Sequence, residues 1–152
     1  MHHTDCVDIL AEIAEGLAFL TPVDSHVGVD APDGHPVAMA VAIRYSERNP
    51  SSAPAISGQL ALGLGDGLPR ALAVNMLGCP PRSAIADDTI RDAALELVNV
   101  LTGNVLPRIY GTVREFALSS PFQIVAMPSS GIQACSLTTE EGLLSMIMTE
   151  QP

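Results

Sequence analysis

Four residues at helical spacing are the strongest candidates for chemistry in this chain. Asp92, Glu96, Asn99 and Gly103 are separated by four, three and four positions. On an α-helix these spacings place all four within roughly 60° of one another, on one narrow stripe. A carboxylate and a carboxamide one turn apart on a stiff helix can orient a water molecule or engage a cationic group of a partner. The pattern therefore predicts a site on the surface of a helix.

A second interpretation is that the stripe is simply the solvent-facing side of the helix, with Asp92 and Glu96 hydrated. Gly103 favours a functional role, because glycine inside a helix costs about 1 kcal/mol of helix propensity. A missing side chain at this position would let another surface come close. The pattern alone leaves both interpretations open.

The helix that carries the stripe is expected to be long and mostly buried. Its pattern runs from Thr89 to about Tyr110, with Asp87 or Asp88 as the cap and Gly111 after its end. Pro107 is expected to kink or end the last turn. The side facing the core is apolar and consists of Ile90, Ala94, Leu97, Leu101 and Val105, flanked by Ala93, Val98 and Val100.

The rest of the chain predicts an α+β fold in one domain, residues 1–152: an antiparallel sheet packed with two long helices. A first helix is expected from Thr4 or Asp5 to about Leu20, and a helix after the glycine-rich turn 63–67 ends at Leu77. In residues 37–45 bulky side chains alternate with alanines, which predicts one strand face that another element can approach closely. The expected strands cover residues 26–29, 37–45, 56–64, 113–118, 122–127, 132–137 and 143–148.

Composition excludes several classes of partner. Of the 152 residues, seven are arginine and none is lysine, against seventeen acids, so the formal net charge is −10. This charge repels nucleic acid and anionic membrane surfaces. No apolar run is long enough to span a bilayer, no basic region precedes the first apolar stretch, and three scattered cysteines fit a reducing compartment. We therefore expect a cytoplasmic protein.

A second candidate site is the loop from His26 to His35. Its two histidines, with Asp24, Asp30 and Asp33, could form a metal cluster and make the protein a ligand-binding domain. A solvated acidic loop is the simpler interpretation. We therefore expect no bound metal.

The stripe also resembles a known motif. In the CheX, CheC and FliY group of chemotaxis phosphatases, Asp or Ser is followed after three residues by Glu, after two more by Asn, and after roughly twenty-two more by Pro. Asp92, Glu96 and Asn99 match this spacing, and Pro121 follows after twenty-one residues. The likeness extends upstream to residues 57–62 (SGQLAL) and 71–78 (ALAVNMLG). A single motif is present, as in CheX, where one motif per subunit and a homodimer are expected.

The resemblance implies a phosphatase for the phosphoaspartate of a CheY-like response regulator. Asn99 would orient the attacking water and Glu96 would dock on a receiver lysine, while Asp92, Gly103 and Pro121 would contact the partner. The protein would need no cofactor of its own, because the receiver supplies Mg²⁺. The family often has a glycine soon after the motif proline, whereas this chain continues with residues 122–124 (FQI). The alternative is therefore a non-catalytic CheX-like adaptor that binds a receiver domain or a flagellar component.

Overall fold

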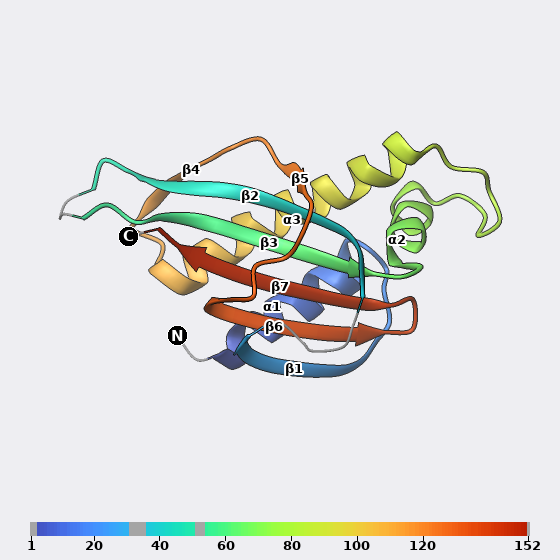
Figure 1. The fold of residues 1–152 in the computed structure, drawn as a ribbon, viewed down its shortest axis with the longest axis horizontal. Helices are drawn as coiled ribbons and strands as arrows, with labels where there is room; N and C mark the ends of the chain where they lie inside the picture. The colour runs from blue at the N-terminus through green and yellow to red at the C-terminus, as the bar shows by residue number, and fades with distance from the viewer. Residues whose placement is uncertain (1–2, 31–35, 51–53, 152) are drawn as a thin grey trace.

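The architecture is a seven-stranded antiparallel sheet with three helices (Figure 1). The computed structural model describes residues 3–30, 36–50 and 54–151. The strand order is β1-β6-β7-β3-β2-β4, and the short strand β5 also pairs with β2. The helices are α1 (His3–Gly16), α2 (Leu68–Leu77) and α3 (Asp87–Tyr110). The strands are β1 (Pro22–Asp30), β2 (Val37–Arg48), β3 (Ser57–Gly65), β4 (Glu115–Leu118), β5 (Phe122–Ile124), β6 (Ser130–Thr139) and β7 (Leu143–Glu150).

The core lies between the helices and one face of the sheet. Across four neighbouring strands, Val41, Leu62, Met146 and Cys135 are in register and all are buried. Their side chains share one face because alternate residues of a strand point the same way. The helices α1 and α3 run behind the sheet in Figure 1 and contact its strands on this face. The predicted α+β class with an antiparallel sheet and packed helices is confirmed.

The opposite face carries small side chains, and a connecting segment crosses it. Ala40, Gly63 and Ser145 are neighbours in register on β2, β3 and β7. A Cβ added at Gly63 would lie 3.2 Å from Cγ of Met127, which belongs to the connection between β5 and β6. Figure 1 shows this connection passing over β3 and β7. The close approach predicted for the alanine-rich face is therefore real, but an extended segment makes it instead of a helix or second sheet.

The first helix is shorter than predicted. It ends at Gly16, where the sequence pattern continued to about Leu20. The chain reverses because Phe19 adopts a left-handed conformation (φ 52°) and the Leu20 amide donates a 2.9 Å hydrogen bond to the Ala14 carbonyl. This bond closes the reversal after the helix and reaches one residue further than the 6→1 bond of the Schellman motif. Residues 17–20 thus cap the helix instead of extending it.

The first strand is longer than predicted. Residues 26–29 were expected to form a short strand inside a loop, but β1 begins at Pro22 and pairs with β6 along nearly its whole length. The long strand β6 supplies backbone hydrogen bonds along this segment, and such pairing cannot be predicted from the local sequence. Tertiary pairing therefore decides the extent of β1.

The late strands do not form one continuous meander. Among the four late strands, β6 and β7 make a hairpin, whereas β4 and β5 both pair with β2. Strand β5 ends at Ile124, not at Met127, because the chain then leaves β2 to cross the sheet. Strand β4 begins at Glu115, after a turn that includes Val113.

Candidate functional site

The stripe lies on α3, which at 24 residues is the longest of the described helices. The apolar side of α3 packs against β2, β3 and the other two helices, which holds the helix rigidly. Two of the predicted core residues, Ile90 and Val100, are only half-buried. The buried residues of α3 are Ala93, Ala94, Leu97, Val98, Leu101, Thr102, Val105 and Leu106.

Both ends of α3 differ in detail from the sequence prediction. The residue that caps the N-terminus is Ala86, without a side-chain hydrogen bond, so neither Asp87 nor Asp88 is the cap. These two acids occupy the first turn, where the helix dipole favours negative charge. Pro107 does not end the helix, which continues to Tyr110. Its ring nitrogen has no hydrogen, so it cannot donate the helical bond that the carbonyl of residue 103 would accept.

The four stripe residues are brought together on the open side of the helix. Asp92, Glu96, Asn99 and Gly103 are all exposed. Their Cα positions span about 16 Å along the axis at 1.5 Å per residue. Among the described residues, no hydrogen bond engages the Glu96 carboxylate or the Asn99 carboxamide. Both groups are therefore available to an external partner.

The charge along this face is uneven. Asp88, Asp92 and Glu96 make its N-terminal half acidic, and the exposed pair of Arg91 with Asp88, at 3.3 Å, offsets only part of this charge. An acidic face on an acidic protein attracts a cationic group of a partner. The Asn99 carboxamide, which offers both donors and an acceptor, can hold a water molecule in a fixed orientation.

Beside Gly103 the surface is hollowed into a small notch of about 140 Å³. The added Cβ of a larger residue at Gly103 would meet no atom within 4 Å, so the space beside this glycine is open. The notch lies where the last turns of α3 meet β4. It is lined by Gly103, Leu106, Pro107, Arg114, Phe116 and Leu118.

Pro121 lies at the same edge of the sheet but does not line the notch. It is half-buried in the corner between β4 and β5, and β5 contacts α3. Two bonds fix this corner: the Arg44 amide donates to Oγ of Ser119 at 3.0 Å, and the Ser119 amide donates to the Arg44 carbonyl at 2.9 Å. The Arg44 guanidinium also lies 4.9 Å from the centre of the Phe122 ring. These contacts hold Pro121 in the corner next to β5, the strand that contacts α3.

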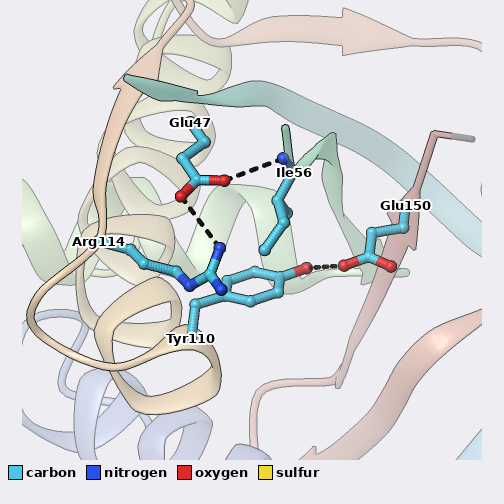
Figure 2. Close-up of polar contacts among 5 residues, drawn as sticks. All are labelled: Glu47, Ile56, Tyr110, Arg114 and Glu150. Carbon is cyan, nitrogen blue, oxygen red and sulfur yellow. Dashed lines mark hydrogen bonds and ion pairs between the residues drawn. The ribbon is translucent and has the colours of Figure 1, made fainter. Parts of the chain in front are cut away.

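Two tyrosines hold the C-terminal end of α3, and Figure 2 shows the bond that one of them, Tyr110, makes to Glu150. The Tyr110 hydroxyl donates a 2.6 Å hydrogen bond to Glu150 of β7. It also lies 3.3 Å from the Tyr45 hydroxyl of β2. Tyr45 in turn donates to the Thr149 carbonyl at 3.0 Å. Burial raises the pKa of Tyr45 to about 12 and raises the pKa of Tyr110 further, with the Glu150 carboxylate adding to the effect. Both hydroxyls therefore remain protonated and keep their donors.

A second contact fixes the chain just after α3. The Glu47 carboxylate, 5% exposed, accepts a 3.0 Å bond from Arg114 and a 3.1 Å bond from the Ile56 amide (Figure 2). One acid thus joins β2, the chain before β3 and the turn before β4. Because the carboxylate is buried and accepts two hydrogen bonds, this contact stabilises the fold more than an exposed ion pair would.

The second candidate site of the sequence is not assembled by the described residues. Asp33 and His35 lie outside the described residues, and His26 is exposed on β1. In the described part of the chain, no three histidine, cysteine or acidic side chains gather as metal ligands. None of the described helices is long and apolar enough to cross a membrane.

Sequence reasoning missed the notch and the tyrosine network. Phe116 and Leu118 alternate on one face of a predicted strand, which was a signal that they share a surface. Nothing in the sequence placed that strand beside the last turns of α3. Its position is set by pairing with β2, which lies far away along the chain. The partnership of Tyr110 with Glu150 had no sequence signal.

Comparison with known proteins gives the fold. No protein-family model matches the sequence, and no curated protein matches it. Solved structures, however, are similar over nearly the whole chain. CheX of Borrelia burgdorferi, solved as a CheX-CheY-BeF3-Mg complex, has 9% identity and a TM-score of 0.70, with 99% of each chain covered.

Two further structures support the same assignment. CheX of Desulfovibrio desulfuricans has 15% identity and a TM-score of 0.65, with 97% of each chain covered. A CheC-like superfamily protein of Shewanella sp. PV-4 has 18% identity and a TM-score of 0.64, with 100% of each chain covered. The predicted resemblance to the CheX and CheC-like chemotaxis proteins is therefore confirmed at the level of the fold.

Proposed function

We propose that this protein hydrolyses the phosphoaspartate of a CheY-like receiver domain, with Asn99 orienting the attacking water and Glu96 docking the partner. The observation that carries the proposal is the exposed pair itself. A carboxylate and a carboxamide stand one turn apart on a rigid helix, without internal hydrogen bonds among the described residues. The fold is shared with a CheX that was solved together with CheY, BeF3 and Mg.

The chemistry fits the few groups that this surface offers. Water attacks phosphorus, the bond between phosphorus and the aspartate oxygen breaks, and the aspartate leaves as a carboxylate while the proton passes to phosphate or solvent. An acyl phosphate is already labile, so placing one water in line is the main contribution still required. The receiver would supply the Mg²⁺. Asn99 can position the water, and the acidic half of the stripe suits a basic group beside the receiver site.

Three further residues of this chain, Asp92, Gly103 and Pro121, have supporting roles in this proposal. Asp92 supports the acidic half of the stripe, and Gly103 lets the receiver approach the helix. Pro121 acts indirectly, by shaping the corner beside α3. A receiver partner is consistent with a cytoplasmic protein, and the homodimer stays a prediction that sedimentation can check.

The test is the lifetime of a phosphorylated receiver. A CheY-like receiver is phosphorylated with acetyl phosphate and Mg²⁺, and its decay is followed with the protein, without it, and with variants. We expect faster decay with the wild type and loss of the acceleration in Asn99→Ala and in Glu96→Ala. Asn104→Ala is the matched control, because Asn104 is also exposed on α3 but lies about 100° round the helix from Gly103.

The outcomes separate the enzyme from the adaptor. Full activity in Asn99→Ala, with the variant folded, would refute the catalytic assignment. Tight binding of the receiver with an unchanged phosphate lifetime would instead establish the adaptor. Loss of activity in Asn104→Ala as well would indicate a general disturbance of α3 and not a role of the stripe.

A further inference from the structure

We propose that the notch beside Gly103 is part of the receiver-binding surface and takes one apolar side chain of the receiver. This inference rests on the proposed function, because it extends the same docking face. The notch is formed where the last turns of α3 meet β4. It lies outside the residues that would handle the phosphate.

Position alone brings a partner to the notch. Gly103 follows Asn99 by four residues, so it lies about 6 Å further along the same exposed face of α3. A stable protein interface covers about 800 Å² on each partner, far more than two side chains provide. A receiver that seats its phosphoaspartate on Asn99 must therefore cover Gly103 as well.

The notch has the character of an interface centre. Towards the N-terminus the stripe continues with charged Asp92 and Asp88, which suit a polar rim. Towards the C-terminus it meets an apolar hollow with Leu106 as its buried floor and with Leu118, 38% exposed, on one wall. Interfaces place apolar pockets at the centre and charges at the rim. The apolar surface therefore favours the C-terminal end of the stripe, at the notch, as the centre of the interface.

The size and rigidity of the notch fit one side chain. Its volume is about 140 Å³, similar to the cavity of about 150 Å³ that accommodates benzene in an engineered protein core. Phe116, which forms one wall, is fixed by its neighbouring rings. Its ring centre lies 5.2 Å from that of Tyr110 and 5.8 Å from that of Tyr45. Arg114 at the rim is held by Glu47. A preformed pocket binds an anchor residue without paying for its own ordering.

Glycine at position 103 keeps this pocket accessible. A side chain there would project into the open space between the helix and an approaching surface. Glycine therefore leaves the helix uncovered at the point where the partner would come closest.

The experiment measures the affinity for a receiver loaded with BeF3 and Mg²⁺, using calorimetry on the full chain. Gly103→Leu fills the approach to the notch, and we expect its Kd to rise about tenfold or more. Asn104→Leu adds the same side chain to the neighbouring exposed position and should leave Kd within about twofold. Leu118→Ala removes a wall from a different element, and its Kd should also rise severalfold.

The result also distinguishes this inference from the proposed function. If Gly103→Leu or Leu118→Ala binds as tightly as the wild type, while Asn99→Ala still abolishes hydrolysis, the notch proposal is wrong and the phosphatase stands. If the wild type neither binds receivers nor accelerates their dephosphorylation, both proposals fail. Equal losses in Gly103→Leu and Asn104→Leu would also overturn the notch, because the effect would then not depend on its position.

Discussion

The Tyr110 hydroxyl donates a 2.6 Å hydrogen bond to the carboxylate of Glu150, and so joins the last residue of α3 to the last residue of β7. The helix that presents Glu96 and Asn99 is thereby fixed to the sheet at its C-terminal end. The same ring contacts Phe116, which walls the notch. One tyrosine thus connects the orientation of the stripe with the shape of the surface beside it.

Removing this hydroxyl should loosen the end of the helix. Tyr110→Phe keeps the ring contacts but loses the charge-assisted bond, so we expect the free energy of unfolding to fall by about 1 to 2 kcal/mol. Urea denaturation measures the change. Glu150→Gln should cost less, since an amide still accepts the bond; a larger loss in Glu150→Gln than in Tyr110→Phe would contradict this account.

Alkaline pH should destabilise the protein through Tyr45. In the unfolded chain this tyrosine ionises near its ordinary pKa of 10, whereas in the folded protein its pKa is raised to about 12. Between these values the unfolded state has lost the proton that the folded state keeps, so stability falls as pH rises and is fully present below pH 10. The loss is about 2 to 3 kcal/mol for a shift of this size.

The alkaline titration has a direct optical readout. The chain has two tyrosines and no tryptophan, so near-ultraviolet tyrosinate absorbance reports only Tyr45 and Tyr110. We expect both to titrate late, together with unfolding. In Tyr45→Phe the loss of stability between pH 10 and 12 should shrink. Early titration of either tyrosine in the folded wild type would contradict the burial argument.

The charge of Glu96 should make receiver binding sensitive to salt. Glu96→Gln keeps the shape of the side chain but removes the charge, and we expect Kd to rise about threefold to tenfold at low ionic strength. The difference from wild type should shrink as salt screens the wild-type interaction. Glu12→Gln, an exposed acid on α1, is the control. Identical salt dependence in Glu96→Gln and wild type would remove Glu96 from the interface.

Gly58 should not tolerate even one methyl group. A Cβ at this position of β3 would overlap the Thr149 carbonyl oxygen and the Tyr45 hydroxyl. Glycine here lets the Tyr45 side chain cross β3 and reach β7. Gly58→Ala should therefore cost about 1 to 3 kcal/mol by overpacking.

Gly16→Ala provides the matched comparison for this strand position. Gly16 ends α1, and an added Cβ there meets nothing within 4 Å. Alanine at this position should be neutral or stabilising by up to about 1 kcal/mol. Thermal unfolding of both variants tests the pair. Similar melting temperatures for the two would show that crowding at Gly58 is relieved by a local shift.

The sequence predicted those features that depend on local periodicity. The long helix, its exposed stripe and its buried side all follow from a repeat of 3.6 residues, and the pattern around Leu97 and Leu101 was sufficient to place them in the core. The antiparallel character of the sheet also followed from the run of late strands. These predictions succeeded because they need only neighbours along the chain.

The features that failed depend on distant partners. The prediction covered only residues 26–29 of the nine-residue strand β1, whose full length is set by pairing with β6. The same holds for Leu118, whose neighbour in register is Tyr45. Asp87 and Asp88 looked like caps, yet the helix begins one residue earlier than a side-chain cap would require. Such choices are made by tertiary packing, which a local pattern does not encode.

The position of β7 within the sheet has a consequence for how the molecule assembles. This strand is synthesised after all the others, yet it lies between β6 and β3, in the interior of the strand order. A nascent chain without β7 holds β1 and β6 apart from β2, β3 and β4, so the sheet cannot close. Non-local pairing of this kind slows folding. The helix α3 packs on β2 and β3, which both precede it in the chain, so its base can form before β7 is made. The insertion of β7 then adds the bond from Tyr110 to Glu150, which fixes the C-terminal end of the helix.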